Sequence, residues 1–208
     1  MKKKNFLSLI TILSLTAYPL TGLAHNGTDH SKNDIMMDSM MKSMDKMKTM
    51  PMTGHADQDF AMMMIEHHKG AIDMAKLEIA HGKDANLKKM SIDIIKKQEK
   101  EIKDMKAFVD KFKASHKDTS IHKVNMSDPF NKKMMASMKM GKMHNNTKAD
   151  VDHKFLQNMI MHHQQGIDMA KAQLAHGKDA SMKKMATQII ADQQKEIKIM
   201  QTMLNKKS

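Results

Sequence analysis

Residues 60–81 read F-A-M-M-M-I-E-H-H-K-G-A-I-D-M-A-K-L-E-I-A-H. Apolar and histidine side chains recur here every three or four residues, which is typical of one face of an α-helix. Charged residues such as Glu66 and Lys69 fall on the opposite face. No segment of the chain alternates in the way that a strand does. The stretch therefore predicts a long amphipathic helix, and the chain is expected to be all-α.

A turn and a second helix are expected directly after this stretch. Gly82 stands where a helix-ending glycine is found, and Asp84 can cap the next helix. Apolar residues then continue at helical spacing from Leu87 to Phe112. Because the connection is short, the two helices must run antiparallel as a hairpin.

The same pattern occurs again 95 residues further along the chain. Residues 155–176 read F-L-Q-N-M-I-M-H-H-Q-Q-G-I-D-M-A-K-A-Q-L-A-H, followed by Gly177 and Asp179. Residues 57–109 and 152–204 agree at about half of their positions. Neither hairpin can cover its own apolar face, so we expect an antiparallel four-helix bundle built from two duplicated hairpins.

The N-terminus has the pattern of an export signal. Residues 1–24 combine a basic start, an apolar stretch and the small-residue end G-L-A, and the chain has no cysteine for lipid attachment or disulfides. We therefore expect a cleaved signal peptide, a periplasmic protein and no stable membrane insertion after cleavage. The mature part divides into a methionine-rich segment and the bundle. Their expected limits are 25–54 and 55–208, with repeat 1 at about 55–114, a connector at 115–150 and repeat 2 at about 151–204.

The net charge of +12 does not indicate a nucleic-acid partner. All 35 basic residues are lysine, so no guanidinium group can hold a base edge or a phosphate through two bonds. Aromatic residues, which stack on bases, make up only 3% of the chain. We interpret the lysines as a solvated helical surface and expect no nucleic acid among the partners.

Methionine is the unusual residue type, with 28 in the chain. A core gains nothing obvious from so many, because methionine packs about as well as leucine but less specifically. Thioether sulfur and imidazole nitrogen are ligands that suit Cu(I) and Ag(I). In a chain without cysteine, the composition therefore indicates a site for a soft metal ion.

The repeated helix carries the candidate ligands. Met64 precedes His67 and His68 by three and four residues, so the three side chains share one helix surface, and Met74 and His81 continue the stripe. The second repeat offers the equivalent set, which is Met159, His162, His163, Met169 and His176. Such residues are often plain core, but their retention in two diverged repeats favours a metal site at which ligands converge across the bundle axis.

Four polar residues lie within the apolar stripe of the other two helices. They are Gln98 and Glu101 in the first repeat and Gln193 and Glu196 in the second. A buried carboxylate is costly unless paired, and a metal-binding imidazole needs an acceptor for its other nitrogen. We expect the two glutamates to orient the histidines. The alternatives are that they reach solvent at the stripe edge or bind the metal directly.

Short methionine-rich helices are expected before both hairpins, within residues 31–51 and 127–141. Their methionines include Met37, Met40, Met41, Met44 and Met47 in the first segment and Met134, Met135 and Met138 in the second. Spacings of three and four also describe an amphipathic helix that simply packs on the bundle. Because nearly every apolar position is methionine, we predict auxiliary metal capture at these residues.

Together these motifs resemble a known family. M-I-E-H-H-K-G-A-I-D-M-A followed by I-I-K-K-Q-E-K-E-I-K-D-M is similar to the CopM-like family of periplasmic copper-binding proteins, over about residues 34–204. The resemblance implies a ferritin-like helical bundle that binds Cu(I) and Ag(I) through methionine and histidine and protects against excess copper. It gives ligand roles to the residues of the two repeats, namely Met64, His67, His68, Met74, Met159, His162, His163 and Met169. The chain departs from the family at Glu66 and Met161, where a proline often precedes the histidine pair, so the first helix should be straighter.

Three classes of function remain to be compared. We expect a protein that is not an enzyme and that buffers or carries copper, with copper ions and a periplasmic copper exporter or oxidase as partners. A ferritin-like metal oxidase would need two E-x-x-H motifs and further glutamates. Glu78 and His81 supply one motif, but Gln173 replaces the glutamate in the second repeat. A methionine-rich adaptor for partner helices would not need paired histidines facing the core.

Overall fold

The computed structural model describes residues 35–115, 129–137 and 149–206, all within one compact unit. These residues form six helices and no strand, which confirms the expected all-α fold. The helices are α1 (Ile35–Thr49), α2 (Ala56–His81), α3 (Ala85–Ser115), α4 (Pro129–Ser137), α5 (Val151–His176) and α6 (Ala180–Lys206). The expected signal peptide and Met138 lie outside the described residues.

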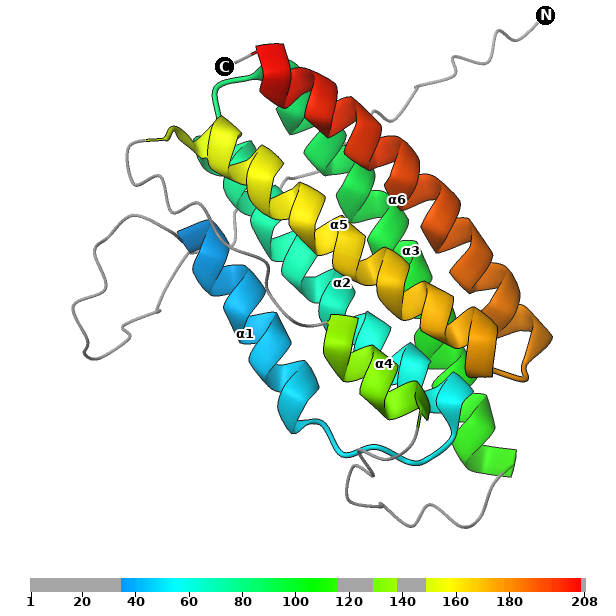
Figure 1. Cartoon of the computed structure of the whole chain (residues 1–208). Helices are drawn as coiled ribbons and strands as arrows, with labels where there is room; N and C mark the ends of the chain where they lie inside the picture. The colour runs from blue at the N-terminus through cyan, green and yellow to red at the C-terminus, as the bar shows by residue number, and fades with distance from the viewer. Residues whose placement is uncertain (1–34, 116–128, 138–148, 207–208) are drawn as a thin grey trace, which may run out of the picture. The chain divides into compact units, whose positions relative to one another are not determined.

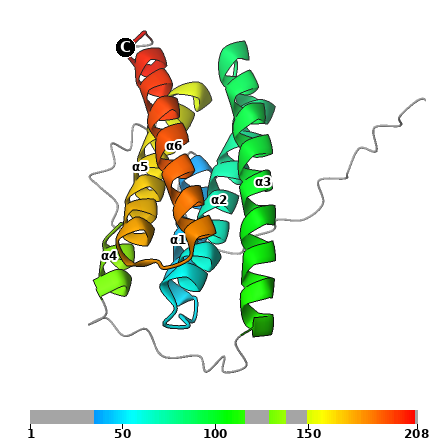
Figure 2. The same cartoon turned by 90° about the vertical axis from the view of Figure 1, so that its right-hand side faces the viewer.

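Two antiparallel hairpins form the bundle, and α2 and α5 are its central pair (Figure 1). Helix α2 packs mainly on α3, and α5 packs mainly on α6. The short helix α1 lies on α2 and α5, whereas α4 lies on α5. Figure 2 shows α3 and α6 as separate columns on one side of the bundle. Each hairpin is thus preceded by a short methionine-rich helix, as expected.

The turns of the two hairpins follow the same residue pattern. The Asp84 carboxylate accepts hydrogen bonds from two backbone amides at the start of α3, and Asp179 does the same for α6. Gly82 and Gly177 end the preceding helices with negative φ angles, of −66° and −67°. Glycine is therefore favoured at these two positions because a side chain would not fit, and not because of an unusual backbone angle. A Cβ atom at Gly82 would collide with the side chain of Glu78, four residues earlier.

Two aspartates tie each hairpin to the other. Asp57, at the start of α2, accepts hydrogen bonds from the Lys178 and Asp179 amides at 2.9 and 3.1 Å. Its counterpart Asp152, at the start of α5, accepts from the Lys83 amide at 2.7 Å. These hydrogen bonds at both ends fix the position of α2 relative to α5 along the helix axis. They therefore determine which side chains of the two helices meet at the centre.

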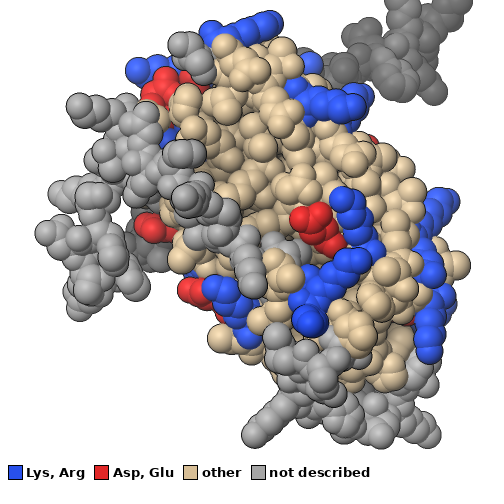
Figure 3. Space-filling model, viewed as in Figure 1, with Lys and Arg blue, Asp and Glu red and all other residues tan. Residues whose placement is uncertain are grey.

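The core is rich in methionine, and α1 and α4 contribute to it directly. Met36, Met40, Met44 and Met47 of α1 and Met134 of α4 are buried. The surface carries the lysines, which are spread over separate parts of the face shown in Figure 3. No helix within the described ranges is long and apolar enough to cross a membrane.

Candidate metal centre

The centre of the bundle holds a stacked pair of histidines, one from each hairpin. His67 on α2 and His162 on α5 are both buried, and their ring centroids lie 3.7 Å apart at an angle of 26°. His67 Nε2 donates to the backbone carbonyl of His162 at 3.1 Å, and His162 Nε2 donates to that of His67 at 3.0 Å. The duplication therefore places the same side chain twice at one crossing point.

The second histidine of each pair faces a glutamate of its own hairpin. His68 Nε2 lies 2.7 Å from Glu101 Oε2, and His163 Nε2 lies 2.7 Å from Glu196 Oε2. Both imidazoles are fully buried, whereas the side chains of Glu101 and Glu196 keep 14% and 15% of their surface exposed. A carboxylate on one ring nitrogen fixes the tautomer and the direction of a histidine that binds metal through the other nitrogen.

These contacts involve only one ring nitrogen, Nε2, of each of the four histidines. Carbonyl oxygens, and carboxylates when ionised, can only accept, so each Nε2 carries the proton and each Nδ1 keeps a lone pair. None of the four Nδ1 atoms has a hydrogen-bond partner among the described residues, and all are buried. An unpaired buried acceptor costs about 1–3 kcal/mol. Each member of the histidine cluster, by which we mean His67, His68, His162 and His163, thus keeps one buried lone pair on Nδ1 that is free to bind a metal ion.

The electrostatics keep the stacked pair neutral. Burial lowers the pKa of His67 well below its ordinary value, and the neighbouring imidazoles of His162, His68 and His163 lower it further. Burial and the imidazoles of His163 and His68 act in the same direction on the pKa of His162. Neutral imidazole is the form that binds metal ions.

Two glycines allow the helices to approach this closely. A Cβ atom on Gly70 would lie 2.9 Å from Ser43 Cβ and 3.2 Å from His162 Nε2. A Cβ atom on Gly166 would lie 3.0 Å from His67 Cε1 and 2.5 Å from the Gln193 amide oxygen. Comparison of the repeats does not reveal these glycines, because they differ by one position in the 95-residue register.

The predicted methionine ligands are all fully buried. Met64 and Met159 lie one turn before the histidines of their helices. Met74 and Met169 follow the first histidine of each pair by seven residues, which is about 10 Å along the helix axis. Met64 and Met159 are therefore within about one helical turn of the histidine cluster along the axis, and Met74 and Met169 are about two turns from it.

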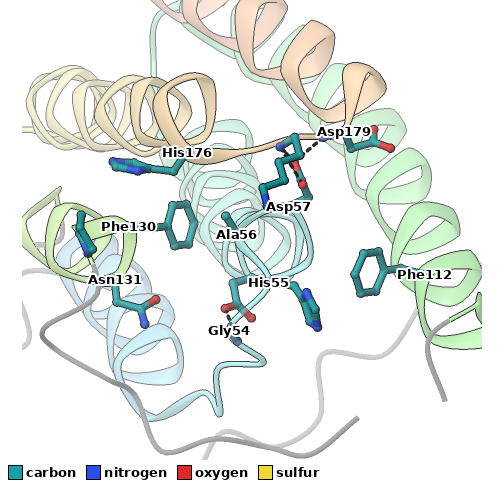
Figure 4. A pocket seen from close by; sticks show the side chains of 12 residues that line it. Gly54, His55, Ala56, Asp57, Phe112, Phe130, Asn131, His176 and Asp179 are labelled. Carbon is teal, nitrogen blue, oxygen red and sulfur yellow. Dashed lines mark hydrogen bonds between the residues drawn. The ribbon is translucent and has the colours of Figure 1, made fainter. Parts of the chain in front are cut away.

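The structure does not bring His81 and His176 to the cluster. They stand at the ends of α2 and α5, fourteen residues or about 21 Å from the first histidine of each pair. His81 is exposed. His176 lies edge-on to Phe130, with ring centroids 6.2 Å apart, at a cavity of about 550 Å³ that also contacts His55 and Phe112 (Figure 4). This cavity lies at the bundle end, away from the cluster.

The remaining predicted site residues are two glutamines in the core and the methionines of α1 and α4. Gln98 and Gln193 are buried, and the side-chain oxygen of each has no hydrogen-bond partner among the described residues. In α1, Met40, Met44 and Met47 face the bundle, Met37 is half-buried and Met41 is exposed; in α4, Met134 is buried and Met135 half-buried. Within the part of the chain that is described, no three His, Asp or Glu side chains are grouped to hold a metal on their own. The buried atoms of this core that could bind a soft metal ion are imidazole nitrogen and thioether sulfur.

Comparisons with known proteins agree with this architecture. The family model "Domain of unknown function (DUF305)" matches residues 9–109 and 57–204. Among solved structures, Cu(I)-bound CopM is similar, with 29% identity, a TM-score of 0.54 and coverage of 72% of this chain and 96% of CopM. Ag-bound CopM gives 30% identity over the same shares, also with a TM-score of 0.54, and CopM has also been solved with Cu(II). A DUF305 protein from Streptomyces coelicolor shares the fold at 24% identity, with a TM-score of 0.56 and coverage of 73% and 93%. No curated protein sequence matches the chain.

Proposed function

The chain belongs to the DUF305 family, and from that premise we propose that it binds Cu(I), and also Ag(I), as a periplasmic copper buffer or carrier. One observation carries the proposal, which is the set of four buried Nδ1 lone pairs in the histidine cluster. Met64 and Met159, which are buried, add thioether sulfur within about one helical turn of these histidines. Uncharged nitrogen and sulfur donors match soft monovalent ions. The similarity to copper- and silver-bound CopM supports the same choice of metal.

The proposed role is binding rather than catalysis. The two glutamates beside the cluster, Glu101 and Glu196, are engaged as acceptors for His68 and His163. They therefore serve to orient ligands. An oxidase of the ferritin-like class would use inward carboxylates as the ligands themselves. Ascorbate-dependent oxygen uptake by the copper-loaded protein, above that of the same copper held by a chelator, would contradict this part of the proposal.

Copper competition tests the site. The chain without residues 1–24 is titrated with a chromophoric Cu(I) chelator in ascorbate, alongside a variant in which all four cluster histidines are glutamine. We expect the variant to bind Cu(I) at least about tenfold more weakly. The matched control is His81→Gln with His176→Gln, which removes two helix-end histidines that lie outside the cluster. Equal loss in both variants would contradict the site.

Localisation is tested separately. We propose that residues 1–24 direct export, that the mature protein lies in the periplasm, and that it passes copper to an exporter or oxidase there or holds it. Fractionation of cells that produce the full chain should place a shortened protein in the periplasmic fraction. Retention of the full-length chain in the cytoplasm or membrane would contradict it.

A further inference from the structure

The two histidine–glutamate pairs have the same Nε2–Oε2 distance of 2.7 Å, but different residues surround their carboxylates. We call Met64, His68 and Glu101 the first half-site, and Met159, His163 and Glu196 the second half-site. In the second half-site, Lys97 Nζ donates to Glu196 Oε1 at 2.6 Å, while the other oxygen of that carboxylate faces His163. In the described part of the chain, no lysine is hydrogen-bonded to Glu101.

The difference arises from one pair of equivalent positions. Residues 97 and 192 correspond at the 95-residue offset, yet one is lysine and the other aspartate. They meet across α3 and α6, where Lys97 Nζ lies 3.4 Å from Asp192 Oδ2. A Gln188 amide also donates to this aspartate oxygen, at 3.0 Å. The pseudo-symmetry of the bundle is therefore broken by a charge pair directly beside the histidine cluster.

This charge pair changes how well His163 can donate to a metal ion. A carboxylate that accepts an imidazole N–H raises the basicity of the other ring nitrogen. The Glu196 carboxylate accepts hydrogen bonds from both His163 and Lys97, whereas the Glu101 carboxylate accepts a hydrogen bond from His68 and none from a lysine of the described residues. Burial raises the pKa of Glu196, but the hydrogen bonds from His163 and Lys97 outweigh it and lower that pKa overall. Asp192 offsets part of the lysine charge, but it contacts Lys97 and Gln188 rather than the Glu196–His163 pair.

We propose that Lys97 makes the two half-sites unequal, so that the first half-site binds a soft monovalent cation first and the second half-site releases it first. The inference rests on the proposed function and adds a division of labour to it. The first half-site has the higher affinity and keeps its ion longer, and the second half-site has the lower affinity and gives up its ion more readily. A duplicated bundle with two identical half-sites would lack this ranking.

The order of filling can be read from the histidines themselves. Protein labelled with ¹⁵N at histidine is titrated with Ag(I), which is diamagnetic and does not change oxidation state, and the ring nitrogens are followed by NMR. We expect His68 Nδ1 to shift before His163 Nδ1, with affinities that differ about tenfold, the lower end of the usual effect of a ligand's hydrogen-bond partner. Parallel filling, or His163 first, would overturn the proposal.

Two variants test the cause in opposite directions. Lys97→Met keeps the aliphatic stem and removes the charge, and it should bring the affinity ratio close to one. Asp192→Asn leaves Lys97 bound to Glu196 alone and should widen the ratio. If Lys97→Met does not fold by circular dichroism, Asp192→Asn decides, and a ratio that stays the same or narrows overturns the proposal.

Lys100→Met is the matched control, because it removes one lysine charge from the same helix. Lys100 is fully exposed and donates to Asp104 at 2.7 Å, and its interaction with Glu101 is Coulombic, without a hydrogen bond, and screened by solvent. We expect an unchanged ratio. A change as large as that of Lys97→Met would show that net charge, and not the contact with Glu196, ranks the half-sites. If Ag(I) shifts none of the four Nδ1 signals, the proposed function fails, whereas equal shifts in both half-sites refute only the ranking.

Discussion

Acid should destabilise the metal-free protein through its two stacked histidines. Burial holds the pKa values of His67 and His162 well below their ordinary value in the folded protein. In the unfolded chain both return to about 6.5. As pH falls below that value, the unfolded chain takes up protons that the folded protein does not, so the free energy of unfolding decreases. The stability is therefore fully present above about pH 6.5 and is lost progressively below it.

The size of the effect follows from the same linkage. An imidazole that stays neutral in the folded protein and titrates near 6.5 in the unfolded chain lowers the free energy of unfolding by about 2 kcal/mol between pH 7 and pH 5. The two together give about 4 kcal/mol, which is a large share of the 5–15 kcal/mol typical of a domain. Copper bound at the cluster would then be lost at low pH because the bundle opens, in addition to direct competition by protons.

Urea unfolding of the chelator-treated protein, followed by far-ultraviolet circular dichroism, measures this directly. The comparison protein carries His67→Gln and His162→Gln, which keep an amide donor for each backbone carbonyl but do not titrate. Its loss of stability between the two pH values should be smaller by most of the 4 kcal/mol. A loss below about 1 kcal/mol in the unchanged protein, or an equal loss in both proteins, would refute the assignment of buried neutral histidines.

Three further outcomes are expected. Met64→Leu and Met159→Leu keep volume and apolarity, so the free energy of unfolding should change by less than about 1.5 kcal/mol. Competition titrations with Cu(I) should show weaker binding by both variants. Normal Cu(I) binding together with a loss of stability would show that these methionines only pack the core. Gly166→Ala gains up to about 1 kcal/mol of helix propensity but places a Cβ atom 2.5 Å from Gln193 Oε1 and 3.0 Å from His67 Cε1. Overpacking of about 1–3 kcal/mol should dominate, and thermal unfolding at lower temperature would show it. Competition titrations should rank Cu(I) and Ag(I) above Zn(II), and equal affinity for Zn(II) would count against a thioether–imidazole site.

The fold could be predicted because its causes are local in the sequence. Helical spacing in residues 60–81 and 155–176 fixes the inward faces of α2 and α5. Asp84 and Asp179 fix the starts of the following helices through hydrogen bonds within three residues. Each hairpin then has one apolar face to cover, and the duplication supplies a matching face. The glutamates at positions 101 and 196 were predictable for a related reason, since a carboxylate inside an apolar stripe needs a buried partner.

The internal arrangement of the site depends on contacts between the repeats, which periodicity does not encode. The stacking of His67 on His162 requires a particular slide of α2 along α5, set by Asp57 and Asp152 at opposite ends. Both aspartates are identical in the aligned repeats, so their repetition was a usable signal. Lys97 gave no such signal, because its partner at the equivalent position is the oppositely charged Asp192. The helix-end histidines shared the stripe with the cluster, but fourteen residues separate them from it along the axis.

Burial of the α1 and α4 methionines changes how these helices are understood. Met40, Met44 and Met47 pack into the bundle, and Ser43 among them lies against Gly70, beside His162. Packing alone requires an apolar face there, but it does not require sulfur. A thioether is uncharged, so it fills a core without the desolvation cost that an empty carboxylate site would impose. A bundle made from methionine and neutral histidine can therefore fold before it binds metal, and the four buried Nδ1 lone pairs are one part of the free-energy cost of that metal-free state. On this argument, packing and metal capture by the methionine-rich helices are compatible uses of the same residues.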